Sequence, residues 1–263
     1  MMSEPDAYPR SLMHVEQRGS GPMVVLVHGG EEEGGATAFA AQFPLARAFT
    51  LIVPDLPGHG QSPVRGGASA ARDALLVADL LGDGAHLVGH SYGGAVALRA
   101  AARRPDAVHS LTLIEPATFD IALNDPEVRR LLGEIAQAVA VPDPRQRLIA
   151  FATAVGIDKT WPDPLPETYR LLAEDLPTML RPPGAAVVPT RQLAAQIAAA
   201  GIPSLVISGG HRAAWENLCD LMAGALGAQR ATIPGYGHAP QQSGEPFNTR
   251  AEQFWSQRPA LAR

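Results

Sequence analysis

The feature that most constrains the fold of this chain is a series of short strand-like runs, rich in apolar and β-branched residues, that alternate with helix-like segments. The runs are Met23–Val27, Leu51–Val53, His86–Val88, Val108–Ile114 and Ile202–Ser208. Apolar residues that follow one another without alternation suit strands buried on both faces, as in a parallel sheet covered by helices. The alternation therefore predicts an α/β fold with a doubly wound, mostly parallel sheet and right-handed crossovers.

The composition agrees with a globular domain and excludes one class of partner. The chain has 263 residues, of which 46% are hydrophobic and 18% are charged, and its formal net charge is -5. A chain of this length can bury a substantial core within one main domain. An acidic balance offers no basic face to a phosphate backbone, so we expect no nucleic-acid partner.

The location of the protein is predicted from its single cysteine and its polar N-terminus. Cys219 stands alone, so no intrachain disulfide can form, which fits a reducing compartment. The first ten residues lack the apolar core of a signal peptide, and no apolar run approaches the roughly 20 residues of a membrane span. We expect a cytoplasmic protein that contacts no membrane and is either a monomer or a homodimer.

A G-x-S-x-G pattern follows the third strand-like run and precedes a helix-like one. It reads Gly89-His90-Ser91-Tyr92-Gly93, and the helix-like stretch continues through Ala95–Ala102. A serine on such a strand-to-helix turn has a strained backbone and an exposed hydroxyl, and the flanking glycines avoid clashes with neighbouring backbone. Ser91 is therefore the candidate nucleophile.

Between residues 117 and 200 the alternation of strand and helix stops. Helix-like segments separated by proline-rich breaks occupy this part of the chain: Glu127–Val141, Arg145–Val155, Glu167–Leu176 and Arg191–Ala200. Strand-like sequence resumes at Ile202. We expect residues 1–116 and 201–263 to form the core domain and residues 117–200 to form an inserted helical cap.

Four motifs give the chain a clear resemblance to the α/β-hydrolase fold superfamily, in its serine hydrolase form with a helical cap. They are His28-Gly29-Gly30, the turn Asp55–Ser62, the nucleophile elbow Gly89–Gly93 and Pro234–His238. Their order and spacing cover nearly the whole chain outside the cap. The resemblance implies a Ser-His-acid triad in the chain order nucleophile, acid, histidine.

His238 is the candidate general base. A serine hydroxyl is a poor nucleophile at neutral pH, so it needs a base to take its proton, and that base needs a carboxylate to fix its tautomer. His238 follows the last strand on a glycine-rich loop, from which a side chain can reach back over the sheet. His28 and His90 are interpreted as supporting residues, whereas the role of His211 is left open.

The sequence departs from the commoner superfamily pattern at the acid. That pattern has an aspartate shortly after the strand Ile202–Ser208, but no carboxylate occurs between Gly209 and Ala214. A second arrangement in the superfamily takes the acid from the end of the preceding strand, where this chain has Glu115. Glu115 is therefore our candidate, and Glu216, on the following helix, is the alternative.

The oxyanion hole is expected from two backbone N–H groups, those of Gly30 and Tyr92. Three glutamates follow Gly30, and we interpret Glu31, Glu32 and Glu33 as a solvated surface turn. The mechanism that the resemblance implies requires no cofactor and no metal.

These assignments predict an enzyme, a serine hydrolase that cleaves a carboxylic ester or lactone of a small hydrophobic molecule through an acyl-enzyme on Ser91. Two alternatives remain open: a carbon–carbon bond hydrolase or perhydrolase on the same triad, and a non-catalytic ligand-binding member of the fold. Specificity is expected from apolar residues of the cap, namely Phe119, Leu123, Phe151, Trp161, Tyr169 and Met179.

Overall fold

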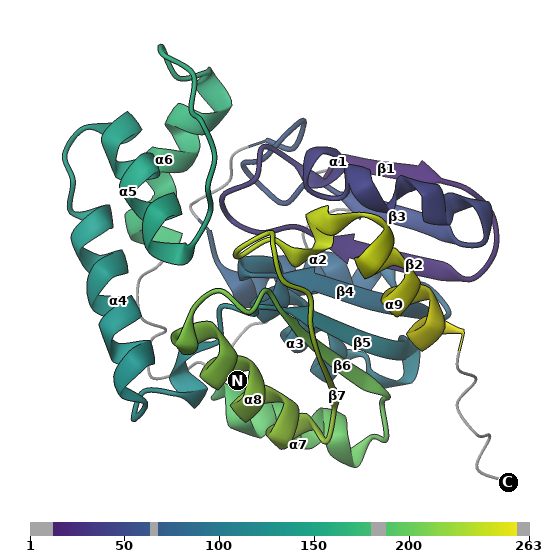
Figure 1. Ribbon diagram of the computed structural model, residues 1–263. Coiled ribbons are helices and arrows are strands. Elements are labelled where there is room, and N and C mark those ends of the chain that lie inside the picture. The colour runs from purple at the N-terminus through teal and green to yellow at the C-terminus, as the bar shows by residue number, and fades with distance from the viewer. Residues whose placement is uncertain (1–12, 64–67, 180–187, 257–263) are drawn as a thin grey trace, which may run out of the picture.

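The computed structural model describes residues 13–63, 68–179 and 188–256, and within them seven strands form one sheet in the order β1-β3-β2-β4-β5-β6-β7 (Figure 1). The strands are β1 Val15–Arg18, β2 Met23–Val27, β3 Thr50–Pro54, β4 Ala85–His90, β5 Val108–Ile114, β6 Ser204–Ser208 and β7 Gln229–Thr232. β1 pairs antiparallel with β3, and every other adjacent pair is parallel. The predicted mostly parallel sheet is confirmed.

Strand boundaries differ slightly from the expected ones. β6 begins at Ser204 rather than at Ile202, because Pro203 between them has no N–H to give to a ladder. The carbonyl of Pro203 still accepts the N–H of Leu111, so this residue lies beside β5 without being part of β6.

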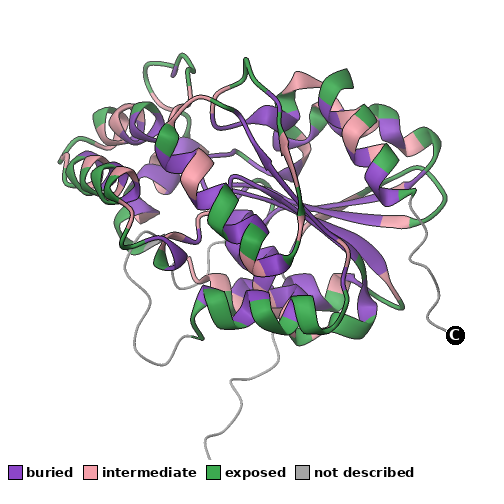
Figure 2. Cartoon of the chain, turned by 60° about the horizontal axis from the view of Figure 1, so that its bottom comes forward, coloured by how far each residue is buried: buried purple, intermediate pink, exposed green. Residues whose placement is uncertain are grey.

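Helices cover both faces of the sheet. One face carries α2 Ala70–Leu80, α3 Tyr92–Arg103, α7 Thr190–Ala199 and α8 Ala213–Leu226, and the other carries α1 Gly35–Ala38, the 3-10 helix η2 Ala40–Arg47 and α9 Glu245–Trp255. Figure 2 shows the buried strands between these two helical layers, whose outer surfaces are exposed. This is the doubly wound arrangement that the strand and helix alternation predicts.

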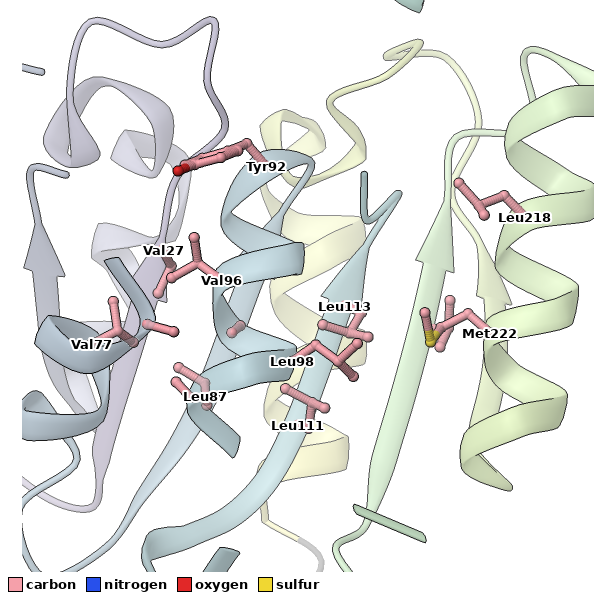
Figure 3. Close-up of a cluster of buried hydrophobic side chains, with 14 of the residues drawn as sticks. Val27, Val77, Leu87, Tyr92, Val96, Leu98, Leu111, Leu113, Leu218 and Met222 are labelled. Atoms are coloured by element: carbon pink, nitrogen blue, oxygen red, sulfur yellow. The ribbon is translucent and has the colours of Figure 1, made fainter. Parts of the chain in front are cut away.

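The continuous apolar runs are explained by this double cover. In β2, Val25 and Val27 belong to the core on the α3 side, whereas Val24 and Leu26 belong to the core on the α9 side. Figure 3 shows the α3-side core, in which Leu87, Leu111 and Leu113 of adjacent strands face helical side chains. Fully burying one such Val or Leu stabilises the fold by about 1.5–3 kcal/mol.

The segment between β5 and β6 is helical, as expected. It contains α4 Pro126–Val139, α5 Pro144–Val155, α6 Glu167–Met179 and α7, after the short 3-10 helix η4 Phe119–Ile121. α4, α5 and α6 pack in succession and stand together beside the sheet (Figure 1), whereas α7 packs against α3 and α8. The division into a core and a cap at residues 117–200 stays a prediction, and the packing of α7 places this helix with the sheet.

The parallel order of β2, β4, β5 and β6 places the candidate site. Residues that follow these strands lie at the same, carboxyl edge of the sheet, where open α/β sheets bind their ligands. Ser91 follows β4, Glu115 follows β5 and Gly209 follows β6. Among the helices of the described residues, none is both long and apolar enough to cross a bilayer.

Candidate active site

Ser91 lies on a strained turn between β4 and α3. Its backbone has φ 51° and ψ -118°, a conformation that residues with a Cβ avoid and that costs on the order of 1–3 kcal/mol. Hydrogen bonds on both sides hold it there: its N–H donates to the carbonyl of Ile114, and its carbonyl accepts the N–H groups of Gly94 and Ala117. The strained serine is thus anchored to the end of β5.

The glycines of the G-x-S-x-G pattern are needed for close backbone contacts. A Cβ on Gly93 would lie 2.3 Å from the carbonyl oxygens of Val27 and His28, and a Cβ on Gly89 would lie 2.4 Å from that of Gly93. Neither position has room for a side chain. The start of α3 therefore packs directly against the end of β2, which brings the loop after β2 beside Ser91.

Three side chains far apart in the sequence form one hydrogen-bonded chain. His238 Nε2 lies 3.0 Å from Ser91 Oγ, and His238 Nδ1 lies 2.6 Å from Glu115 Oε2. All three residues are buried. Trp215 stacks on the His238 ring with 4.2 Å between ring centroids, so the imidazole is held in its plane from the α8 side.

Glu115 is held as a carboxylate. Its Oε1 accepts the N–H of Gly209 at 2.6 Å and lies 3.4 Å from His211 Nδ1. Burial raises the pKa of Glu115, but the neighbouring His211 and His238 outweigh this effect and lower the pKa to about 2. An ionised Glu115 keeps the proton of His238 on Nδ1, so that the Nε2 lone pair faces the Ser91 hydroxyl.

The alternative acid, Glu216, has different partners. Its Oε1 accepts the N–H of Gly210, and its Oε2 accepts from the Ser208 hydroxyl and from Arg230. These contacts hold the turn between β6 and α8. The structure thus brings Glu115, and not Glu216, to His238. The catalytic roles of Ser91, His238 and Glu115 stay predictions.

The two backbone groups expected to form an oxyanion hole come from the start of α3 and from the loop after β2. Tyr92 is the first residue of α3, so its N–H has no acceptor within the helix, and its hydroxyl donates to Asp73 at 2.6 Å. Gly30 follows the His28-Gly29 turn. His28 Nδ1 donates to the Gly29 carbonyl and Nε2 accepts the N–H of Leu56, a neutral state that fits the lowering of its pKa to about 3 by burial.

The prediction that Glu31, Glu32 and Glu33 form a solvated turn is wrong for the first two. Glu31 is 4% exposed and Glu32 is 6% exposed, whereas Glu33 is exposed. The loop folds inward, so that Glu31 Oε1 lies 3.5 Å from His90 Nδ1. Burial and the neighbouring Glu31 raise the pKa of Glu32 to about 7. A run of glutamates carries no local signal of such burial, which depends on packing against β4.

One group of side chains within the described residues has the spacing of metal ligands. Glu31, His90 and His238 each offer a ligand atom, and these atoms lie within 4.8 Å of one another. Both ring nitrogens of His238 already have partners in Glu115 and Ser91. A metal here would have to displace one of these contacts, so the arrangement favours a proton-transfer role for His238.

The apolar residues expected to set specificity have different environments. Phe151, Trp161 and Tyr169 are buried, whereas Leu123 is exposed and the side chain of Met179 lies outside the described residues. The ammonium of Lys159 lies over the Trp161 and Tyr169 rings and donates to the Tyr169 hydroxyl. This cluster joins the loop after α5 to α6.

A doubly wound α/β sheet whose strand-to-helix turn carries a strained serine beside a histidine and a carboxylate is the arrangement of the α/β-hydrolase fold. Comparison with known proteins agrees. The chain belongs to the alpha/beta hydrolase family, whose model matches residues 24–250.

Curated relatives match part of the chain. Lipase LipV of Mycobacterium tuberculosis is 37% identical over 153 residues, which are 56% of this chain and 56% of the relative. A pimeloyl-[acyl-carrier protein] methyl ester esterase of Chromobacterium violaceum is 45% identical over 106 residues, 39% of this chain and 40% of the relative. The matches thus span about half the length of these relatives or less.

Solved structures match nearly the whole chain. A hydrolase from Pseudomonas aeruginosa has a TM-score of 0.70 at 21% identity, covering 93% of this chain and 94% of that one. An alpha/beta hydrolase from Sphaerobacter thermophilus has a TM-score of 0.65 at 26% identity, covering 93% and 96%. An N-acyl homoserine lactone degrading enzyme has a TM-score of 0.63 at 23% identity, covering 92% and 96%. At such identities the first and third show the fold alone.

Proposed function

We propose that this protein is a serine hydrolase that cleaves a carboxylic ester or lactone of a small hydrophobic molecule. The observation that carries the proposal is the buried hydrogen-bonded chain from Ser91 through His238 to Glu115. A carboxylate with a pKa of about 2 at the far end of that chain stabilises the imidazolium that forms when His238 accepts a proton.

The mechanism proceeds through an acyl-enzyme. His238 Nε2 takes the proton of the Ser91 hydroxyl as Oγ attacks the acyl carbonyl, and the imidazolium then gives this proton to the leaving alcohol oxygen. The backbone N–H groups of Gly30 and Tyr92 hold the tetrahedral oxyanion, and each such donor is worth about 10²–10³ in rate. Water, deprotonated by His238, then releases the acid product.

The names of relatives support ester chemistry. The two curated relatives are called a lipase and a methyl ester esterase, and the residues they match exceed a hundred in each case. The same serine, base and oxyanion hole also serve carbon–carbon bond hydrolysis and perhydrolysis, which makes these reactions outcomes of the test. Location in the cytoplasm is part of this proposal.

We assign substrate enclosure to the helices α4, α5 and α6. The end of α5 contacts the loop that carries His238, because the carbonyl of Gly156 accepts the N–H of His238 at 3.1 Å. Phe151 on α5 and the buried pair Trp161 and Tyr169 give this segment an apolar interior. An apolar enclosure suits a hydrophobic acyl or alkyl group.

The test is hydrolysis of a chain-length series of p-nitrophenyl esters, with covalent labelling by a fluorophosphonate probe. Turnover and labelling by the wild type, both lost in Ser91→Ala, are the expected results. Labelling without ester turnover redirects the assignment to lactones or carbon–carbon cleavage. If the wild type shows neither labelling nor turnover, the result favours a non-catalytic binding protein and contradicts the proposal.

A further inference from the structure

Behind the proposed triad lies a second buried pair of a carboxyl group and a histidine, which the mechanism above does not use. Glu31 Oε1 lies 3.5 Å from His90 Nδ1, and neither atom accepts or donates a hydrogen bond among the described residues. His90 is fully buried and Glu31 is 4% exposed. Unpaired polar atoms in such a place cost on the order of 1–3 kcal/mol each, so this arrangement calls for an explanation.

The other ring nitrogen of His90 fixes the protonation of the pair. His90 Nε2 lies 2.8 Å from the backbone carbonyl oxygen of His238. A carbonyl oxygen only accepts, so Nε2 carries a hydrogen and donates it. In a neutral ring Nδ1 is then an acceptor, and it faces a carboxyl oxygen. Two acceptors at this distance repel each other unless a proton lies between them.

We propose that Glu31 and His90 share one proton, and that this pair makes Glu31 a positioning residue for the general base. The proton resides on the Glu31 carboxyl or on His90 Nδ1, and in both cases it joins the two side chains by a hydrogen bond. His90 Nε2 then donates to the carbonyl of His238, while the carbonyl of Gly156, at the end of α5, accepts the N–H of His238. The backbone of the base is thus fixed at both of its polar groups.

The loop is shaped to let Glu31 reach this place. A Cβ on Gly29 would lie 2.6 Å from Glu31 Oε2 and 2.7 Å from Oε1, so the carboxyl group folds back over Gly29. A side chain at position 29 would push the carboxyl group away from His90. The absence of a side chain at position 29 is therefore tied to the position of Glu31.

The inference rests on the proposed function, and its test compares Glu31→Ala and Glu31→Gln with the loop control Glu33→Ala. An amide N–H donates to His90 Nδ1 as the shared proton does, so Gln keeps the hydrogen bond that Ala removes. We expect Glu31→Ala to lower kcat for a p-nitrophenyl ester and the fluorophosphonate labelling rate by about 10- to 100-fold, with KM within about twofold. Glu31→Gln and Glu33→Ala stay within about threefold of the wild type.

A second comparison separates positioning from loss of structure. We expect Gly29→Ala to slow labelling when Glu31 is present, because the new Cβ clashes with the Glu31 carboxyl group. In the Glu31→Ala background that carboxyl group is gone, so Gly29→Ala slows labelling little further. If the wild type and Glu31→Ala are labelled at equal rates, or if Glu31→Ala and Glu31→Gln slow labelling equally, this inference is overturned and the proposed function is not affected. A wild type that the probe does not label overturns the proposed function and this inference with it.

Discussion

Replacement of Glu115 by glutamine tests the proposed triad most sharply, because the two oxygens of Glu115 serve two different donors. Oε1 accepts the N–H of Gly209 and Oε2 faces His238 Nδ1, both at 2.6 Å. A glutamine has one oxygen, so it can satisfy only one of them. If that oxygen keeps Gly209, the amide NH₂ faces His238 and moves the imidazole proton to Nε2, where it blocks proton transfer from Ser91.

The opposite orientation of the amide is no better. The amide oxygen then accepts from His238, but the NH₂ group faces the buried N–H of Gly209, and the two donors repel each other. We expect the first orientation and a fall in kcat of about 10⁴-fold, which corresponds to about 5 kcal/mol of transition-state stabilisation. KM changes little, since the substrate contacts are unaffected.

The assay is steady-state ester hydrolysis together with the fluorophosphonate labelling rate, and Glu216→Gln is the matched control. Glu216 supports the turn after β6 and does not contact His238, so its glutamine variant is expected to keep activity within about threefold. Near-normal activity of Glu115→Gln together with a large loss in Glu216→Gln refutes the reasoning.

The same variant also tests stability against pH. The pKa of Glu115 is lowered from 4.5 to about 2 in the folded protein, so its ionisation stabilises the fold above pH 4.5, by roughly 3 kcal/mol, and this contribution is lost as pH falls toward 2. We expect the gap in unfolding free energy between the wild type and Glu115→Gln to narrow over that range. Urea unfolding measured at several pH values checks this, and a constant gap contradicts it.

Three further predictions concern backbone and capping. Ser91→Gly relieves the strain of a positive φ and is expected to be about 1 kcal/mol more stable to urea than Ser91→Ala, with both variants unlabelled by the probe; equal stabilities contradict the strain argument. Gly93→Ala places a Cβ 2.3 Å from two carbonyl oxygens at the end of β2, so we expect losses of roughly 3 kcal/mol in stability and of most activity, checked by thermal unfolding and turnover. Asp125→Ala removes the N-cap of α4 and is expected to cost about 1 kcal/mol without changing kcat, whereas a large fall in kcat would link α4 to the chemistry.

Much of the fold was predictable because its signals are local. Apolar runs without alternation identify strands covered on both faces, and the glycines at positions 89 and 93 identify a turn too tight for side chains. Glu115 was expected from the resemblance to the superfamily, in which a second arrangement takes the acid from the end of the preceding strand, and no carboxylate follows β6 before Glu216, the alternative. The extent of the cap was less predictable, because nothing in the sequence of α7 distinguishes packing on α3 and α8 from packing on α4 to α6.

The sequence by itself determined the order of strands and helices along the chain and the strained serine, since each depends on residue types within a few positions of one another. The expected partners of the serine followed from the resemblance of its motifs to the superfamily. Tertiary structure alone decided that Glu31 and Glu32 are buried, that His90 lies between Glu31 and the carbonyl of His238, and that Trp215 stacks on the His238 ring. These contacts join residues from loops and helices far apart in the chain. Their formation depends on how loops from different strand ends pack against one another at the carboxyl edge of the sheet, which no local pattern encodes.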